Sequence, residues 1–332
     1  MHNRQSYIPV VKIVLTMLLG MFANLMNVSA VPAQNFPDRA IRFIVPFPPG
    51  GSTDIAARTL EPYLKAGFGQ SVVIENKPGA AGQLGVQEML KATPDGHTVV
   101  LASPGSTAIN NNFRNLGYDP TTDLAPLAIV GTVPTAFAVH PDVPAATIAE
   151  FISYAKANPN KLNYAISGVG SQIHLAAELF VVRSGVKMQA VPFNGTQPAT
   201  LALLSGHVQA AVSDLATLLP FAAEKKLRIL AVVDAERAAM APEIPTMAES
   251  GFPGFVASGW VMLFASSKTP RPILSRWNSE LQEVLKRPQV VTALTTGGMG
   301  VSIVSLSQAE QFHQNELKKW RDVIETAKIV IK

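Results

Sequence analysis

The sequence of 332 residues contains no cysteine, which excludes disulfide bonds, thiolate metal sites and a cysteine nucleophile. Charged residues are also scarce, at 15% of the chain against about 25% in an average protein. No segment combines clustered lysine and arginine with aromatic residues, so we expect no nucleic-acid partner. The composition therefore favours a protein that folds on ordinary apolar cores.

The one long apolar run lies at the N-terminus. Arg4 and Lys12 supply positive charge, residues 13–28 are mostly apolar, and Val28-Ser29-Ala30 provides small residues for cleavage. We therefore predict a secretory signal peptide over residues 1–30, with a second possible cut after Ala33. A membrane anchor is the less favoured alternative, because the run falls short of the ~20 clean apolar residues that a span needs.

Removal of residues 1–30 leaves 25 Lys+Arg against 23 Asp+Glu, so the mature chain carries a net charge of +2. Such a small charge does not indicate an acidic partner, although the pI of the full sequence is 9.2. The roughly 300 remaining residues are more than one core comfortably fills, which predicts two lobes.

Residues 40–64 combine a strand, a glycine turn and the start of a helix. Residues 40–47 are β-branched or aromatic almost throughout, as in a parallel strand that is buried on both faces. Gly50 and Gly51 follow, and one of residues 52–54 can cap a helix from Ile55 to Leu64. Because a helix start presents unpaired N–H groups and partial positive charge, this turn is predicted to receive a small anion, a carboxylate above all.

The same pattern recurs along the chain. At least five strand ends run into small residues and a helix start, and they are distributed over two α/β halves. We predict that residues 34–132 and 256–332 form the first lobe and that residues 133–255 form the second. A strand at Gly259–Phe264 and two closing helices, Pro272–Leu285 and Gln308–Lys328, belong to the first lobe. Adjacent lobes would direct several of these turns into one cleft.

Rival interpretations exist for individual residues. Ser171 and His174 suggest a serine hydrolase, but they lie one turn apart at one helix start and lack the Gly-x-Ser-x-Gly pattern. His174 and Glu178 are too few to bind a metal, so His174 is read as a capping or packing residue first. Asp214 follows a strand, where it either caps the next helix or contacts a ligand through an ammonium or hydroxyl group. Phe47 is read as a core residue first and as a cleft wall second.

Several stretches, in order, resemble one family. They are VPFPPGGSTDIAAR, VVIENKPGAAGQLG, KATPDGHT, LGYDPTTDLAPL, AISGVGSQIHLAAELF, VPFNGTQPA, KKLRILAV and EIPTMAESGFPGF. From about Phe36 to the C-terminus the chain is similar to the solute-binding proteins of tripartite tricarboxylate transporters, the Bug/TctC family. This resemblance implies a type II periplasmic-binding-protein fold, in which two α/β lobes joined by two crossing segments close over a small carboxylate.

The resemblance also implies which residues line the ligand site, chiefly through backbone amides and hydroxyl groups. They are Pro48, Gly50, Gly51, Ser52, Asp54, Ser103, Ser106, Gly168, Gly170, Ser171, His174, Asn194, Gly195 and Asp214.

We therefore expect a periplasmic, monomeric binding protein without catalytic residues, metal or cofactor. Its ligand would be a di- or tricarboxylate, an amino acid or an aromatic acid, delivered to the membrane permease subunits of a tripartite tricarboxylate transporter. The alternative is a ligand-binding sensor subunit for a membrane receptor kinase, which would use the same pocket.

Overall fold

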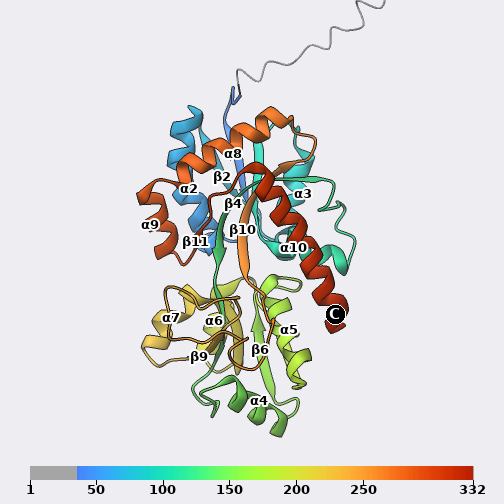
Figure 1. Ribbon diagram of the computed structural model, residues 1–332, viewed down its shortest axis with the longest axis vertical. Coiled ribbons are helices and arrows are strands. Elements are labelled where there is room, and N and C mark those ends of the chain that lie inside the picture. Colours follow the sequence, from blue (N-terminus) through green and yellow to red (C-terminus); the bar gives the residue numbers. More distant parts are fainter. Residues whose placement is uncertain (1–35, 332) are drawn as a thin grey trace, which may run out of the picture. The chain divides into compact units, whose positions relative to one another are not determined.

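The computed structural model describes residues 36–331, and all structural statements below concern this range. The predicted signal peptide and both predicted cleavage sites lie outside the described residues. From Pro37 onward the chain forms one compact unit that contains two β-sheets with their helices (Figure 1).

The first sheet has six strands in the order β11-β4-β10-β3-β1-β2. Strand β1 pairs in parallel with β2 and β3, whereas β10 is antiparallel to both β3 and β4. Strands β1 and β3 are almost fully buried, which explains their continuous runs of apolar residues. The bounds are β1 (Ile41–Val45), β2 (Val72–Asn76), β3 (Thr98–Ala102), β4 (Leu124–Val133), β10 (Gly259–Ser266) and β11 (Gly300–Val301).

Five helices and three short helical turns accompany this sheet. Helix α2 packs against β1, β2 and α8, and α10 packs against β4. The largest side chains of this layer, Trp277 and Trp320, are completely buried. The bounds are α2 (Ser52–Phe68), η2 (Ala80–Gly82), α3 (Gln83–Lys91), η3 (Gly105–Ile109), η4 (Asn110–Asn112), α8 (Arg271–Leu285), α9 (Pro288–Thr296) and α10 (Leu306–Ala327).

The second sheet has five strands in the order β7-β6-β8-β5-β9. An aromatic cluster fills one side of it, with the ring centroid of Phe137 lying 5.0 Å from Phe151 and 4.7 Å from Phe180. The bounds are β5 (Thr135–Val139), α4 (Ile148–Ala157), β6 (Leu162–Ile166), α5 (Gln172–Ser184), β7 (Met188–Pro192), α6 (Thr196–Leu204), β8 (Ala210–Asp214), α7 (Leu215–Ala223) and β9 (Arg228–Val232).

Two segments cross between the sheets. The first passes from β4 to β5 through Pro134, and the second leads from the end of β9 to the start of β10. The two segments approach closely where Gly259 pairs with Val133, because a Cβ atom at position 259 would lie 2.9 Å from the Val133 carbonyl oxygen. Only glycine fits at this point without displacing the backbone of β4.

Strand register places the carboxyl ends of the parallel strands at the crossing segments. Ala102, the last residue of β3, pairs with Met262 near the start of β10. Asp214, the last residue of β8, pairs with Thr135 at the start of β5. Both sheets therefore direct their strand-to-helix turns toward the region between them, which is where ligands bind in open α/β sheets.

The predicted fold class, two α/β lobes of the periplasmic-binding-protein type, is confirmed. One helix and one short strand were missed: α9 follows α8 directly, so the chain closes with three helices rather than two, and β11 precedes the last of them. Helix α9 has only nine residues, and its buried residues Val290 and Leu294 give a short apolar pattern.

Within residues 36–331, no helix has the length and apolar character required to cross a bilayer. In the same range, no three histidine, cysteine or acidic side chains are arranged to hold a metal ion.

Candidate ligand-binding cleft

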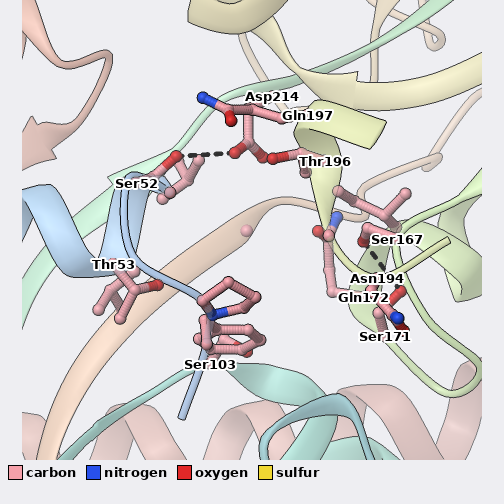
Figure 2. Close-up of a pocket in the computed structure, with 18 of the residues that line it drawn as sticks. Ser52, Thr53, Ser103, Ser167, Ser171, Gln172, Asn194, Thr196, Gln197 and Asp214 are labelled. Carbon is pink, nitrogen blue, oxygen red and sulfur yellow. Dashed lines mark hydrogen bonds between the residues drawn. The ribbon is translucent and has the colours of Figure 1, made fainter. Parts of the chain in front are cut away.

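A cavity of about 250 Å³ lies between the two sheets and is lined by their strand-to-helix turns (Figure 2). The first sheet contributes Phe47, Pro48, Pro49, Gly51, Ser52, Thr53, Ser103 and Pro104. The second contributes Ser167, Ser171, Gln172, Ile173, Asn194, Gly195, Thr196, Gln197, Pro198 and Asp214. The crossing strands contribute Val133, Gly259, Trp260 and Val261.

The turn after β1 is held from behind by Asp54. This buried carboxylate accepts hydrogen bonds from the Gly50 backbone N–H (3.0 Å), the Asn76 side chain (2.9 Å) and Arg58 Nε (2.9 Å). Asn76 also donates to the Phe47 carbonyl oxygen at 3.0 Å. Burial alone would raise the pKa of Asp54, but the hydrogen bonds from Arg58, Gly50 and Asn76 outweigh it and keep that pKa below its usual value. Asp54 therefore fixes the shape of the turn and is not part of the cavity wall.

The start of α2 is open to the cavity. Its N-cap residue is Gly51, and no side chain of the described residues caps it. Gly50 has φ +87°, a conformation that favours glycine, and it turns the chain into the helix. The first N–H groups of α2 are consequently left for another acceptor, and Gly51, Ser52 and Thr53 all line the cavity.

The turn after β6 is held by its own side chains. Ser171 Oγ accepts from the His174 backbone N–H at 3.1 Å and so caps α5. The His174 ring accepts at Nδ1 from the Gly170 N–H, also at 3.1 Å. His174 Nε2 lies 3.5 Å from Glu178 Oε1. The ring of His174 is thus buried behind the turn, where it binds the Gly170 N–H.

Helix α6 begins at the cavity without a side-chain cap. Gly195, its N-cap residue, has φ +110°, and no described side chain caps it. Thr196 and Gln197 line the cavity, and Pro198 has no N–H to satisfy. Asn194 precedes the helix and adds an amide group to the same wall.

The turn after β3 brings the two lobes into contact. Ser103 lines the cavity, whereas Ser106 is completely buried behind it. A Cβ atom at Gly105 would lie 3.2 Å from the Gly170 carbonyl oxygen, and one at Gly170 would lie 1.8 Å from Asn110 Oδ1. Small residues at positions 105 and 170 therefore permit this close approach.

Asp214 connects the lobes from the other side of the cavity. Ser52 Oγ, at the start of α2, donates to Asp214 Oδ2 at 2.7 Å. Burial raises the pKa of Asp214, and hydrogen bonds from the hydroxyl groups of Ser52 and Thr196 oppose this shift. Figure 2 shows these three side chains together, well apart from Ser103 and Ser171.

The cavity wall offers many donors and few charges. Its residues include neither lysine nor arginine nor histidine, and Asp214 is the one ionisable group among them. A bound anion would be met by backbone N–H groups at the starts of α2, α5 and α6, and by serine hydroxyls. Such donors are fixed in place before a ligand arrives, so little ordering is required on binding.

The residues predicted as site residues fall into two groups. The cavity wall brings together Pro48, Gly51, Ser52, Ser103, Ser171, Asn194, Gly195 and Asp214. The other predicted residues lie outside that wall and shape the turns behind it, namely Gly50, Asp54, Ser106, Gly168, Gly170 and His174.

Sequence reasoning missed Gln172, Thr196 and Trp260 as parts of the wall. Gln172 donates to the Thr135 hydroxyl at 3.4 Å and to the Ala257 carbonyl oxygen, which ties α5 to both crossing segments. Trp260 donates from Nε1 to Glu316 at 2.7 Å, so its ring is fixed by α10. Gln172 and Thr196 could have been predicted, because each is the first residue of a helix that follows a glycine turn. Trp260 could not, because it lies in the interior of a strand.

Residues 56–329 match the family described as Tripartite tricarboxylate transporter family receptor, TctC. The chain belongs to this family. The protein is thus a solute-binding protein of the periplasmic TctC/Bug type and not an enzyme, which removes the hydrolase alternative.

Individual TctC-family proteins are similar over nearly their whole length. BugT of Bordetella pertussis is 34% identical over 310 residues, which cover 92% of this chain and 95% of BugT. R. palustris Rpa4515, solved with adipate, is 33% identical with a TM-score of 0.83, covering 89% of this chain and 99% of that one. MatC from Rhodopseudomonas palustris, solved with bound malate, is 32% identical with a TM-score of 0.81. The match covers 87% of this chain and 100% of MatC.

Proposed function

We propose that this TctC-family receptor captures a small carboxylate in the periplasm, as a monomer, and delivers it to the membrane permease of a tripartite tricarboxylate transporter. The observation that carries this proposal is the cavity wall itself. Helix starts from both lobes converge on one cavity that contains hydroxyl and amide groups but no cationic side chain. This chemistry suits a compact carboxylate that is held by backbone donors.

Two relatives support the class of ligand. Rpa4515 was solved with adipate and MatC with malate, both of them small carboxylates, and each shares about a third of its residues with this chain. A cavity of about 250 Å³ is at the small end of ligand sites, which typically enclose ~300–1,000 Å³. We accordingly expect acids of a few carbon atoms rather than large conjugates.

A thermal-shift screen tests the carboxylate. The mature protein is heated with mono-, di- and tricarboxylates, amino acids and aromatic acids, and at least one is expected to raise its melting temperature. A ligand at a hundred times its Kd stabilises the folded state by about 2.7 kcal/mol. No shift from any member of the screen would contradict the proposal.

Gly51→Val tests whether the start of α2 takes part. Gly51 has φ −81°, and the one atom that a Cβ would meet within 4 Å is the Pro48 carbonyl oxygen, 3.9 Å away. The fold therefore tolerates valine, whose methyl groups would occupy the space beside the free N–H groups, and we expect the ligand-induced shift to disappear. Ala66→Val, at an exposed position of the same helix, is the matched control. Unchanged binding by Gly51→Val would show that α2 does not contact the ligand.

The partner distinguishes a transport receptor from a sensor. For a transport receptor, deletion of the gene abolishes uptake of the ligand into cells. For a sensor of a receptor kinase, uptake continues and only the transcriptional response to the ligand is lost. N-terminal sequencing of the exported protein tests the location and shows whether cleavage follows Ala30 or Ala33.

A further inference from the structure

The charge of the cavity wall is carried by a single side chain, Asp214. Of the residues that line the cavity, none other is ionisable, and no basic residue is present to offset this carboxylate. A carboxylate in such a wall is a hydrogen-bond acceptor for a ligand, whereas every other polar feature nearby is a donor or can act as one.

Helix capping does not account for Asp214. It occupies the N-cap position of α7, but its side chain accepts no capping hydrogen bond there. Instead the carboxylate lies in the cavity wall, where Ser52 Oγ donates to Oδ2 at 2.7 Å and the Thr196 hydroxyl also bonds to it. Burial raises the pKa of Asp214, and the two hydroxyl donors oppose this rise. The carboxylate has room for further hydrogen bonds.

The position of Asp214 is fixed by the fold. As the last residue of β8 it pairs with Thr135 of β5, and it is 9% exposed. It can therefore accept a hydrogen bond from a ligand without changing its own position. Figure 2 shows it at one side of the cavity, with Ser103 and Ser171 at a distance on the other.

The two sides of the cavity thus differ in what they can accept. The side with Ser103, Ser171 and the start of α5 presents donors to an anion. A second ligand carboxylate on the Asp214 side would place three negative charges in one cavity without a cation. An ammonium group there would pair with Asp214 through a charge-assisted hydrogen bond.

We propose that the ligand is an amino carboxylate: its carboxylate binds on the side of Ser103, Ser171 and the start of α5, and its ammonium group, at the other end of the molecule, donates to Asp214. This inference rests on the proposed function and narrows it from carboxylates in general to acids with a terminal amine. Asp214 is then the residue that selects against dicarboxylates of equal length.

Matched pairs of acids test the selection by isothermal titration calorimetry on the mature protein. Each pair differs only in the terminal group: succinate with 3-aminopropanoate, glutarate with 4-aminobutanoate, and adipate with 5-aminopentanoate. In at least one pair the amino acid is expected to bind tenfold or more tightly than the dicarboxylate, since one charged hydrogen bond has about that effect.

Asp214→Asn assigns the selection to this residue. The amide keeps the shape and can still accept from Ser52, but it removes the negative charge. The preferred amino acid is expected to bind at least tenfold more weakly, and the matching dicarboxylate more tightly. Asp142→Asn, the same change on an exposed side chain outside the cavity wall, is expected to change neither Kd.

The outcomes separate this inference from the proposed function. A wild-type preference for the dicarboxylate in every pair overturns the inference and leaves the carboxylate function intact. A preference for the amino acid that survives in Asp214→Asn also overturns it, because another group must then bind the amine. If no acid of any pair binds, both the inference and the proposed function fail for ligands of this size. If Asp214→Asn does not fold, the matched pairs of acids titrated against the wild-type protein still show whether the amino acid is preferred, and a preference for the dicarboxylate in every pair overturns the inference.

Discussion

The turns after β1 and after β6 face the same cavity but are held by different chemistry. Behind the first lies an ionic network in which Asp54 accepts from Arg58, Asn76 and the Gly50 N–H. The second is held by a hydroxyl and a ring, since Ser171 caps α5 and His174 accepts from the Gly170 N–H. Both arrangements fix a glycine N–H by a side chain four residues further along.

The difference lies in what each turn leaves for a ligand. Because Asp54 bonds to the turn from behind, the start of α2 stays uncapped toward the cavity. Ser171, in contrast, satisfies one N–H of its own helix and presents its hydroxyl to the cavity. The turn after β1 therefore leaves all the first N–H groups of its helix for a ligand, whereas the turn after β6 uses one of them for its own cap. Charge shapes the turn of the first lobe only, and it is kept out of the donor side of the wall.

The largest effect is expected when the ionic network of the first turn is removed. Asp54→Ala leaves Arg58, Asn76 and the Gly50 N–H without their shared acceptor, which should lower the free energy of unfolding by about 2–4 kcal/mol. Ligand affinity should fall as well, since the start of α2 loses its support. Urea denaturation and calorimetry measure the two quantities. A free energy of unfolding within 0.5 kcal/mol of wild type, roughly the effect of an ordinary surface substitution, would show that the turn keeps its shape without Asp54.

A smaller effect is expected where the second turn meets the first lobe. The Cβ of Gly170→Ala would lie 1.8 Å from Asn110 Oδ1, so the lobes cannot approach as closely and affinity should fall about tenfold. Gly168→Ala is the matched control, because Gly168 also has positive φ (+132°) but no atom lies within 4 Å of its added Cβ. Equal losses of affinity in both variants would attribute the effect to backbone strain rather than to the contact between lobes.

The smallest effect appears only in acid. Because the pKa of Asp54 is lower in the folded protein than its unfolded value of about 3.9, its stabilisation is complete above that value and is lost as the pH falls through the folded pKa. The stability gap between wild type and Asp54→Asn should therefore narrow below about pH 4. Melting temperatures from pH 7 to pH 2.5 measure this gap. A gap that stays constant over the acid range would show that the Asp54 charge does not matter.

Local signals in the sequence predicted the architecture well. Buried strands such as residues 41–45 and glycine turns such as Gly50-Gly51 are recognisable from their composition. Because units of strand, turn and helix recur in two parts of the chain, the sequence implies two lobes. The ends of elements were less certain. Helix α2 begins at Ser52, three residues before the predicted start, because the turn residues themselves adopt helical geometry.

The wall of the cavity was predicted less completely. The sequence pointed to the correct turns, but it did not show which side of each turn faces the ligand. Asp54 and His174 directly follow the wall residues Thr53 and Ile173, yet both point behind the turn because a helix rotates each successive side chain by about 100°. Trp260 joins the wall through a strand that returns from far along the chain.

The sequence by itself determined the class of the protein and the chemistry of its turns. Apolar strands, glycines and hydroxyl residues follow one another within a few positions, and each of them shapes the backbone locally. The tertiary structure alone decided that Ser52 would meet Asp214, 162 residues away, and that no cation would share their cavity. Those contacts depend on how two sheets are joined by two crossing segments. The register of β5 with β8 and of β10 with β3 and β4 sets that arrangement.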